Sequence, residues 1–266
     1  MELLSYDFVQ RGIVTGVLIA FACSVAGVFL ILKRMAFLGA GLSHASFGGI
    51  ALAMLLGVEP FIFTALFTLM VGNLVQFLSS RRHVPGDTAI ALVFSGGVSL
   101  AVLVLGIVKG FGENVFSYLF GSILMVTREE MFFALVLTVL SLAFFALSYK
   151  KLVLVTFSEE IARLRGVRIA LLNHTFISVS SLVIVLSVKA VGIVLASSML
   201  VVPALKSLLV ARSFFMSIVL SVIVSLTSTV AGLAVAFYYN LPPSGSIVGV
   251  MILFFALAFA VRGLRA

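Results

Sequence analysis

The stretch GIVTGVLIAFACSVAGVFLIL, residues 12–32, has 21 residues without a charge and lies between Arg11 and Lys33. About 20 apolar residues carry an α-helix across a hydrocarbon core of ~30 Å, so the stretch predicts a transmembrane helix. The preceding residues include Glu2 and Asp7 and lack the basic segment of a cleaved signal peptide. We therefore expect this helix to remain as the first span.

The rest of the 266-residue chain repeats this pattern. It is 63% hydrophobic and 10% charged, with a mean hydropathy of +1.34, whereas soluble chains are about half apolar and about a quarter charged. This composition excludes an ordinary cytosolic enzyme and predicts an all-α membrane protein with one transmembrane domain, residues 1–266. The apolar stretches predict nine transmembrane helices, near residues 12–32, 35–58, 60–80, 88–108, 131–149, 169–188, 190–211, 213–239 and 244–261. Pro203 predicts a kink or break in the seventh.

The distribution of Lys and Arg predicts how these helices are oriented. The apolar stretch 114–127 has only 14 residues, and its topology decides the sidedness of everything after it. If this stretch does not cross the membrane and the N-terminus lies outside, 13 of the 17 basic residues are cytoplasmic. If the stretch crosses, only 6 of the 17 are cytoplasmic. Because cytoplasmic loops carry an excess of basic residues, we predict an outside N-terminus, an inside C-terminus and an outside re-entrant or interfacial segment at 114–127.

Missing motifs narrow the possible functions further. The single cysteine, Cys23, excludes an internal disulfide and a cysteine-based zinc site. The sequence has no GxxxxGK[ST] phosphate loop, serine-nucleophile motif or HExxH pair, so no enzyme is expected and any ATP hydrolysis must come from a partner. Its basic residues flank spans instead of forming a stripe with aromatics, which argues against nucleic-acid binding. The absence of charged residues from the middle of the first six spans disfavours a self-powered carrier.

A few polar residues are candidates for function. His44 lies ~13 Å along the second predicted span, and neutral imidazole is a good ligand for zinc and similar ions; Ser43 adjoins it. A histidine bonded to a carbonyl of a neighbouring helix is the alternative, and the sequence leaves both open. His174, near the start of the sixth span, is a weaker metal candidate. Asp87, which precedes Thr88, is expected to cap the fourth span.

Two local patterns predict contacts. The pairs Gly41/Ala45 and Gly245/Gly249 have the small-residue spacing that lets membrane helices approach closely. After the fifth span, a short amphipathic helix is expected at about 156–167, beginning with a capping box of Thr156 and Glu159 and ending at Gly166. It is either a docking element for a partner or an ordinary interfacial loop helix.

Three blocks of this sequence together resemble one known family. They are RMAFLGAGLSHASFGGIALA (34–53), SEEIARLRGV (158–167) and KAVGIVLASSMLVVPAL (189–205), the last followed by GLAVAFYYNLPPSGSIV up to Val248. The chain resembles the permease subunits of the zinc and manganese ABC importers over nearly its whole length. The resemblance implies a type II importer-like permease in the inner (plasma) membrane of a prokaryote. It also implies a homodimer in the lipid bilayer, cytoplasmic ABC ATPase subunits and an extracytoplasmic metal-binding protein.

The same resemblance assigns roles to residues. It implies that His44, with Ser43 as a possible helper, lines a path for zinc or manganese, and that no cofactor is tightly bound. ATPase coupling is implied for the segment at 158–167, through Glu159, Glu160, Ala162, Arg163 and Gly166. The chain departs from the family pattern at Ala40, where the family has Asp, and at Gly48, where it has Pro, so the identity of the metal is open. Alternatives are a permease for an iron chelate or cobalamin-like ligand, a gradient-driven carrier and a structural membrane scaffold.

Overall fold

The computed structural model describes residues 7–80, 84–107 and 126–263, and every regular element in these ranges is an α-helix. Nine of the helices in this part of the chain are long and apolar enough to cross a membrane, which confirms the predicted all-α fold. They are α1 (Asp7–Leu32), α2 (Leu38–Leu56), α3 (Pro60–Ser79), α4 (Gly86–Ile107), α6 (Arg128–Phe157), α8 (Ile169–Val191), α9 (Ile193–Val210), α10 (Phe214–Tyr239) and α11 (Pro243–Gly263). A short helix, α7 (Glu159–Leu164), joins α6 to α8.

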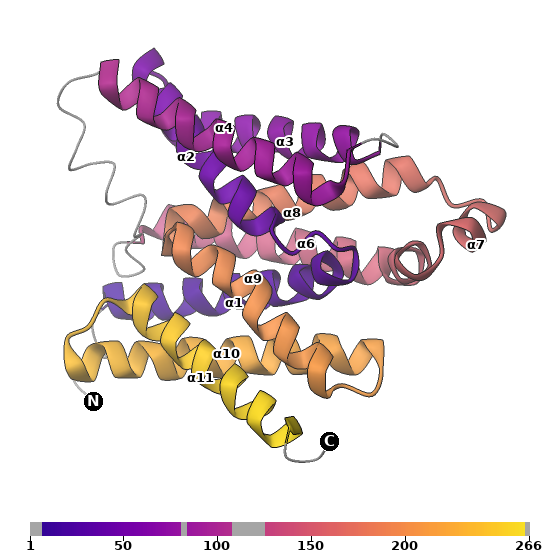
Figure 1. Ribbon diagram of the computed structural model, residues 1–266. Coiled ribbons are helices and arrows are strands. Elements are labelled where there is room, and N and C mark those ends of the chain that lie inside the picture. Colours follow the sequence, from indigo (N-terminus) through magenta and orange to yellow (C-terminus); the bar gives the residue numbers. More distant parts are fainter. Residues whose placement is uncertain (1–6, 81–83, 108–125, 264–266) are drawn as a thin grey trace.

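The helices form three groups (Figure 1). α2, α3 and α4 pack together on one side, α1, α10 and α11 on the other, and α6, α8 and α9 lie between them. α7 projects at one end of the bundle, and the described part of the chain begins and ends at opposite ends. This is the arrangement that an odd number of spans requires. The membrane side of each end stays a prediction from charge.

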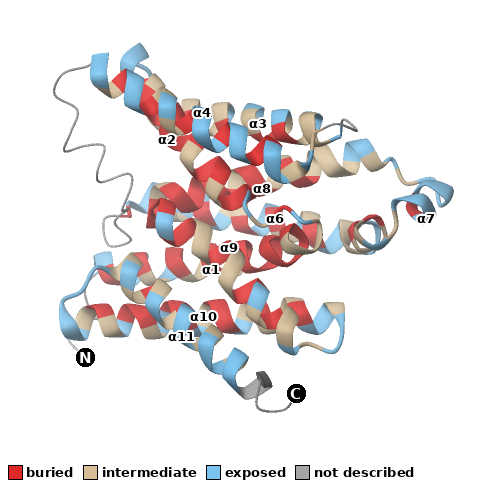
Figure 2. Cartoon of the chain, viewed as in Figure 1, coloured by how far each residue is buried: buried red, intermediate tan, exposed pale blue. Residues whose placement is uncertain are grey.

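α1 and α2 are the most buried spans, whereas α11 is mostly exposed (Figure 2). Since lipid tails are as apolar as leucine, membrane helices associate through close packing and hydrogen bonds. On α10, Ser221 and Ser225 donate hydrogen bonds of 3.1 Å to carbonyl oxygens of α1. Gly27 lets α9 approach the other side of α1, because a Cβ there would overlap the Leu200 carbonyl. Phe29 stacks on Phe145, with ring centroids 5.6 Å apart.

Several helix ends differ from the predicted ones. α1 begins at Asp7, five residues before the uncharged stretch, and α6 has 30 residues instead of the predicted 131–149. Pro203 lies inside α9 without ending it. The break between α8 and α9 falls at Gly192, whose φ of +86° suits glycine. Of the predicted outside segment 114–127, residues 114–125 lie outside the described residues.

The predicted capping box at Thr156 is wrong. Thr156 lies in the last turn of α6, where its hydroxyl donates to the Leu152 carbonyl at 2.7 Å. α7 is capped by Ser158, whose side chain accepts from the Ile161 amide at 3.3 Å, so the helix starts at Glu159. Ser and Thr cap helices by the same chemistry, and the sequence did not show that α6 continues into this segment.

The glycines between α2 and α4 allow the closest backbone contact in this part of the bundle. A Cβ on Gly97 would lie 2.6 Å from Cα of Ala45 and 2.7 Å from the His44 carbonyl oxygen, and one on Gly48 would lie 2.8 Å from the Gly97 carbonyl oxygen. The Gly41/Ala45 pair therefore lies at a helix contact, as its spacing predicts. The other pair does not, because a Cβ on Gly245 or Gly249 would meet none of the described atoms within 4 Å.

Gly97→Ala should push α4 away from α2, because the added methyl meets backbone atoms that cannot rotate away. We expect a loss of roughly 1–3 kcal/mol, the usual cost of overpacking, seen as a lower melting temperature of the purified protein. Gly96→Ala is the matched control, since a Cβ at this neighbouring position would meet nothing within 4 Å. Equal melting temperatures for the two variants would contradict the tight α2–α4 contact.

Candidate functional site

His44 lies on α2 at the contact with α4 and is half-buried. Its ring faces Phe94 of α4, with ring centroids 4.4 Å apart and planes at 59°. The backbone contact at Gly97 fixes this stretch of α2 against α4. Within the described part of the chain, no hydrogen bond reaches the imidazole, so the alternative of a histidine bonded to a neighbouring carbonyl is not observed there. One or both ring nitrogens therefore stay available to a ligand.

Ser43 is fully buried, and its hydroxyl has no hydrogen-bond partner among the residues described. Consecutive residues of an α-helix point about 100° apart, so Ser43 and His44 are directed to different sides of α2. The structure thus gives no sign that the two side chains act on one ion from the same face.

A cavity of about 450 Å³ opens between α2 and α4 next to Phe94. It is lined mainly by apolar groups and includes Ala40, the position where the family has a carboxylate. Asp87 lines the same cavity and, among the described residues, is the only charged one that does. α4 begins at Gly86, so Asp87 lies in the first turn and not at the predicted N-cap position. No local pattern indicates that Asp87 and Ala40 line the same cavity, because they are 47 positions apart in the sequence.

His174 belongs to a hydrogen-bonded cluster between α3 and α8. Its Nδ1 lies 2.9 Å from Oδ1 of Asn73, and the Asn73 amide donates to Ser178 Oγ at 2.9 Å and to the Leu69 carbonyl at 2.9 Å. Such a cluster supplies partners for polar groups in an apolar environment. The surroundings of His174 therefore favour helix packing over ion binding.

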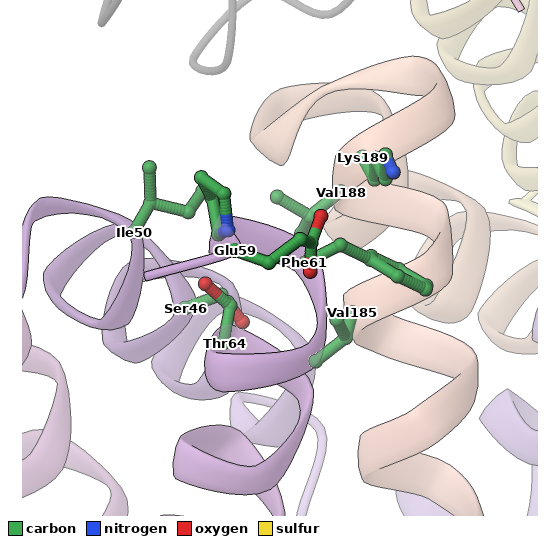
Figure 3. Close-up of a pocket in the computed structure, with 9 residues that line it drawn as sticks. Ser46, Ile50, Glu59, Phe61, Thr64, Val185, Val188 and Lys189 are labelled. Carbon is green, nitrogen blue, oxygen red and sulfur yellow. The ribbon is translucent and has the colours of Figure 1, made fainter. Parts of the chain in front are cut away.

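A second, much smaller cavity of about 40 Å³ lies at the far end of α2, α3 and α8 (Figure 3). Glu59 caps α3 there by accepting from the Ile62 amide at 2.7 Å. Lys189 of α8 pairs with Glu130 of α6 at 3.2 Å, and its ammonium lies 4.0 Å from the centre of the Phe61 ring. These contacts tie α3, α6 and α8 together. A hole of this size has room for a water molecule and not for a hydrated ion.

α7 exposes the residues that the resemblance assigns to coupling. Glu159, Glu160 and Arg163 are exposed, and only Ala162 is buried. Its apolar residue Leu164 is 88% exposed, which leaves an uncovered apolar group beside the charges. Gly166 ends the segment with a φ of +74°, a conformation that favours glycine.

Lys33 connects the end of α1 to this region. Its ammonium donates to Oδ1 of Asn173 on α8 at 2.7 Å and lies 5.3 Å from the centre of the Phe176 ring. Burial lowers the pKa of Lys33 from 10.5 to about 8, while the charge of Glu159 acts in the opposite direction. From the sequence, Lys33 is recognisable only as a basic residue at the end of the first span.

The residues described here contain no group of three or more His, Cys, Asp or Glu side chains that could enclose a metal ion. A ligand set within this part of one chain would therefore be small. Few ligands suit an ion that must enter a site and leave it again.

Comparison with known proteins agrees with this architecture. Residues 5–262 match the ABC 3 transport family. The chain is 32% identical to a probable metal transport system membrane protein of Treponema pallidum over 98% of both chains. It is 29% identical to the manganese transport system membrane protein MntC of Halalkalibacterium halodurans, over 97% of this chain and 88% of that protein.

A solved structure shows the same fold. PsaBC of Streptococcus pneumoniae, determined in complex with a Fab, superposes with a TM-score of 0.84 at 28% identity, over 97% of this chain and 92% of that one. The nine apolar helices found in the described part of the chain, the exposed α7 and a family match along almost the whole sequence agree with one another. The chain therefore belongs to the ABC 3 transport family and is a permease of a metal ABC importer.

Proposed function

We propose that this chain imports a divalent metal ion, manganese or zinc, by alternating access in the plasma membrane of a prokaryote. The observation that carries the proposal is the His44 imidazole, which reaches the α2–α4 contact without a hydrogen-bond partner among the described residues. Imidazole and carboxylate ligands suit both ions. The curated relative named for manganese transport supports manganese as the first ion to test.

The path that we propose runs along α2 and α4. His44 is its nitrogen ligand, and Asp87 is a carboxylate in the adjoining cavity, where Ala40 supplies none. Ser43 and His174 are secondary candidates, since one is turned away from His44 and the other is engaged with Asn73. No cofactor is required, because the ion is the substrate.

We propose that a second copy of this chain completes the path and that separate subunits supply the energy of ATP hydrolysis and deliver the metal. Two copies of this chain form the path, cytoplasmic ABC ATPase subunits dock on α7 of each copy, and an extracytoplasmic protein delivers the metal. The exposed Glu159, Glu160 and Arg163, together with the uncovered Leu164, support docking on α7. Lys33 passes movement of α7 to α1 and α8, since it bonds to Asn173 and is attracted by Glu159.

His44→Ala should lower ATP-dependent metal uptake while leaving assembly intact. Loss of one weak ligand, worth ~1.4 kcal/mol, corresponds to about a tenfold lower rate below saturation. The measurement is uptake of Mn²⁺, Zn²⁺ and Fe²⁺ into proteoliposomes that contain the permease, its ATPase and its binding protein. Asp87→Asn should have a smaller effect in the same direction, because Asp87 is more exposed than His44.

His174→Gln is the comparison variant for this experiment. It should lower thermal stability and leave the order of preference among the three metals unchanged. Uptake of a metal chelate in preference to free ions would favour the alternative permease for chelates. Transport by the permease alone, without ATPase, would show a carrier instead. Undiminished uptake by His44→Ala would remove His44 from the path.

Replacing Glu159 and Glu160 by Lys should uncouple ATP hydrolysis from transport. The charge reversal places two cations on the exposed side of α7, where the native pair is acidic. We expect uptake to fall by about tenfold, the effect of losing ~1.5 kcal/mol, which is the lower end of the coupling measured for close interfacial charge pairs. Glu129→Lys, an exposed charge reversal at the start of α6, should have little effect. Normal uptake by a stably expressed double variant would count against docking on α7.

Lys33 should make stability depend on pH in a defined direction. The folded chain releases its proton near pH 8 and the unfolded chain near 10.5, so raising the pH across this window favours the folded state. The melting temperature of the wild type minus that of Lys33→Met should therefore increase from pH 7 to pH 9.5. A change of ~1 kcal/mol would shift it by roughly 2–4 °C. A difference that stays constant with pH would contradict the buried, weakly basic Lys33.

A further inference from the structure

A third cavity, separate from the α2–α4 path, has the composition of a binding site for an anion. It has a volume of about 420 Å³ and lies between α6, α8 and the link from α7 to α8. Lys151 of α6, Arg165 after α7 and Arg168 before α8 all line it, together with the hydroxyl-bearing Ser148 and Thr175. Helix α6 and the link from α7 to α8 therefore bring three positive charges to one concave surface.

These three cations are not balanced by neighbouring carboxylates. None of the ion pairs found among the described residues involves Lys151, Arg165 or Arg168, and no Asp or Glu lines the cavity. Glu159 and Glu160 are close in sequence, but they lie on α7 outside the lining. The start of α8 adds the positive end of a 23-residue helix dipole. The cavity therefore has an unbalanced positive potential.

The ion pair at the other end of the bundle is a reference point for the distance between this cavity and the opposite end of the spans. Lys189 and Glu130 are joined there at 3.2 Å. Lys151 follows Glu130 by 21 positions on α6, and Arg168, the residue before α8, precedes Lys189 by 21 positions. At 1.5 Å per residue each distance is about 31 Å, close to the ~30 Å hydrocarbon core. Lys151 and Arg168 thus lie at the level of lipid headgroups, on the side that the charge distribution predicts to be cytoplasmic.

The remaining wall of the cavity is apolar and reaches toward the hydrocarbon. Leu171, in the first turn of α8, is 62% exposed, and Phe144 lies seven residues before Lys151 on α6, ~10 Å deeper. A phosphate beside the cations would be attracted by their charge, and alkyl carbons beside Leu171 would lie against an apolar side chain. A soluble ATPase subunit would meet the cations but would not reach Phe144.

We propose that this cavity binds an anionic phospholipid of the cytoplasmic leaflet, with its phosphate held by Lys151, Arg165 and Arg168 and its first acyl carbons against Leu171. Basic pockets between transmembrane helices on the cytoplasmic side are a recognised form of headgroup site. Arg165 and Gly166 line the cavity and link α7 to α8. A lipid bound there therefore holds this link in place, next to the α7 helix on which the ATPase subunit docks. The site does not depend on which metal is transported.

The test is native mass spectrometry of the purified permease with equal amounts of phosphatidylglycerol and phosphatidylcholine. The wild type should retain phosphatidylglycerol selectively. Lys151→Gln combined with Arg168→Gln should lower that selectivity by about tenfold or more, since two cations near the phosphate are lost. The matched control is Lys150→Gln combined with Arg212→Gln, which removes the same charge from exposed residues outside the cavity and should keep the selectivity.

The alternatives give different results in the same measurement. Equal loss in the pocket variant and the control would show general surface attraction and overturn the proposal. Displacement of the lipid by inorganic phosphate would show a free-anion site and would also overturn it. If the pocket variant kept the lipid but no longer bound the ATPase subunit, the cations would serve ATPase docking, and the proposal would be overturned. Lys151→Arg, which keeps the charge, should retain phosphatidylglycerol, so the proposal stays testable if the double variant does not fold.

Discussion

The contact between α2 and α4 at Gly48 and Gly97 is the constraint on which the site depends. It brings two backbones together where no side chain intervenes, with the His44 carbonyl within 2.7 Å of where a Gly97 Cβ would be. Without hydrophobic attraction between helices in lipid, such backbone proximity is what fixes one helix against another. The orientation of His44 toward Phe94 and the cavity beside Asp87 follow from it.

The cations of this protein divide according to what surrounds them. Lys189 is paired with Glu130 and holds the ends of α6 and α8 in register. Lys33 is buried against Asn173, which lowers its pKa and joins α1 to the region of α7. Lys151 and Arg168 line a cavity that has no carboxylate among its described lining residues, and we propose that their charge binds a lipid phosphate. A count of basic residues predicts membrane orientation from all of them and cannot separate these three situations.

Uncharged polar side chains inside the spans also differ in whether they have a partner on a neighbouring helix. Ser221 and Ser225 donate to carbonyls of α1, and Asn73 joins α3 to His174 of α8. A hydrogen bond to a neighbouring helix satisfies a group that lipid cannot satisfy. His44, which forms no such bond within the described residues, stands apart from His174 for this reason. Only the arrangement of the helices shows the difference between the two histidines.

The sequence by itself determined the nine spans and the class of protein, because the length of an uncharged apolar stretch is a local property set by bilayer thickness. It also placed α7 to within three residues, although Ser158 and not Thr156 is its cap. The tertiary structure alone decided which polar groups meet. Asp87 and Ala40 line one cavity although they are 47 positions apart, and Lys33 bonds to Asn173, which is 140 positions away. Such contacts depend on how the helices pack against one another, and the hydropathy of a single span does not determine that packing.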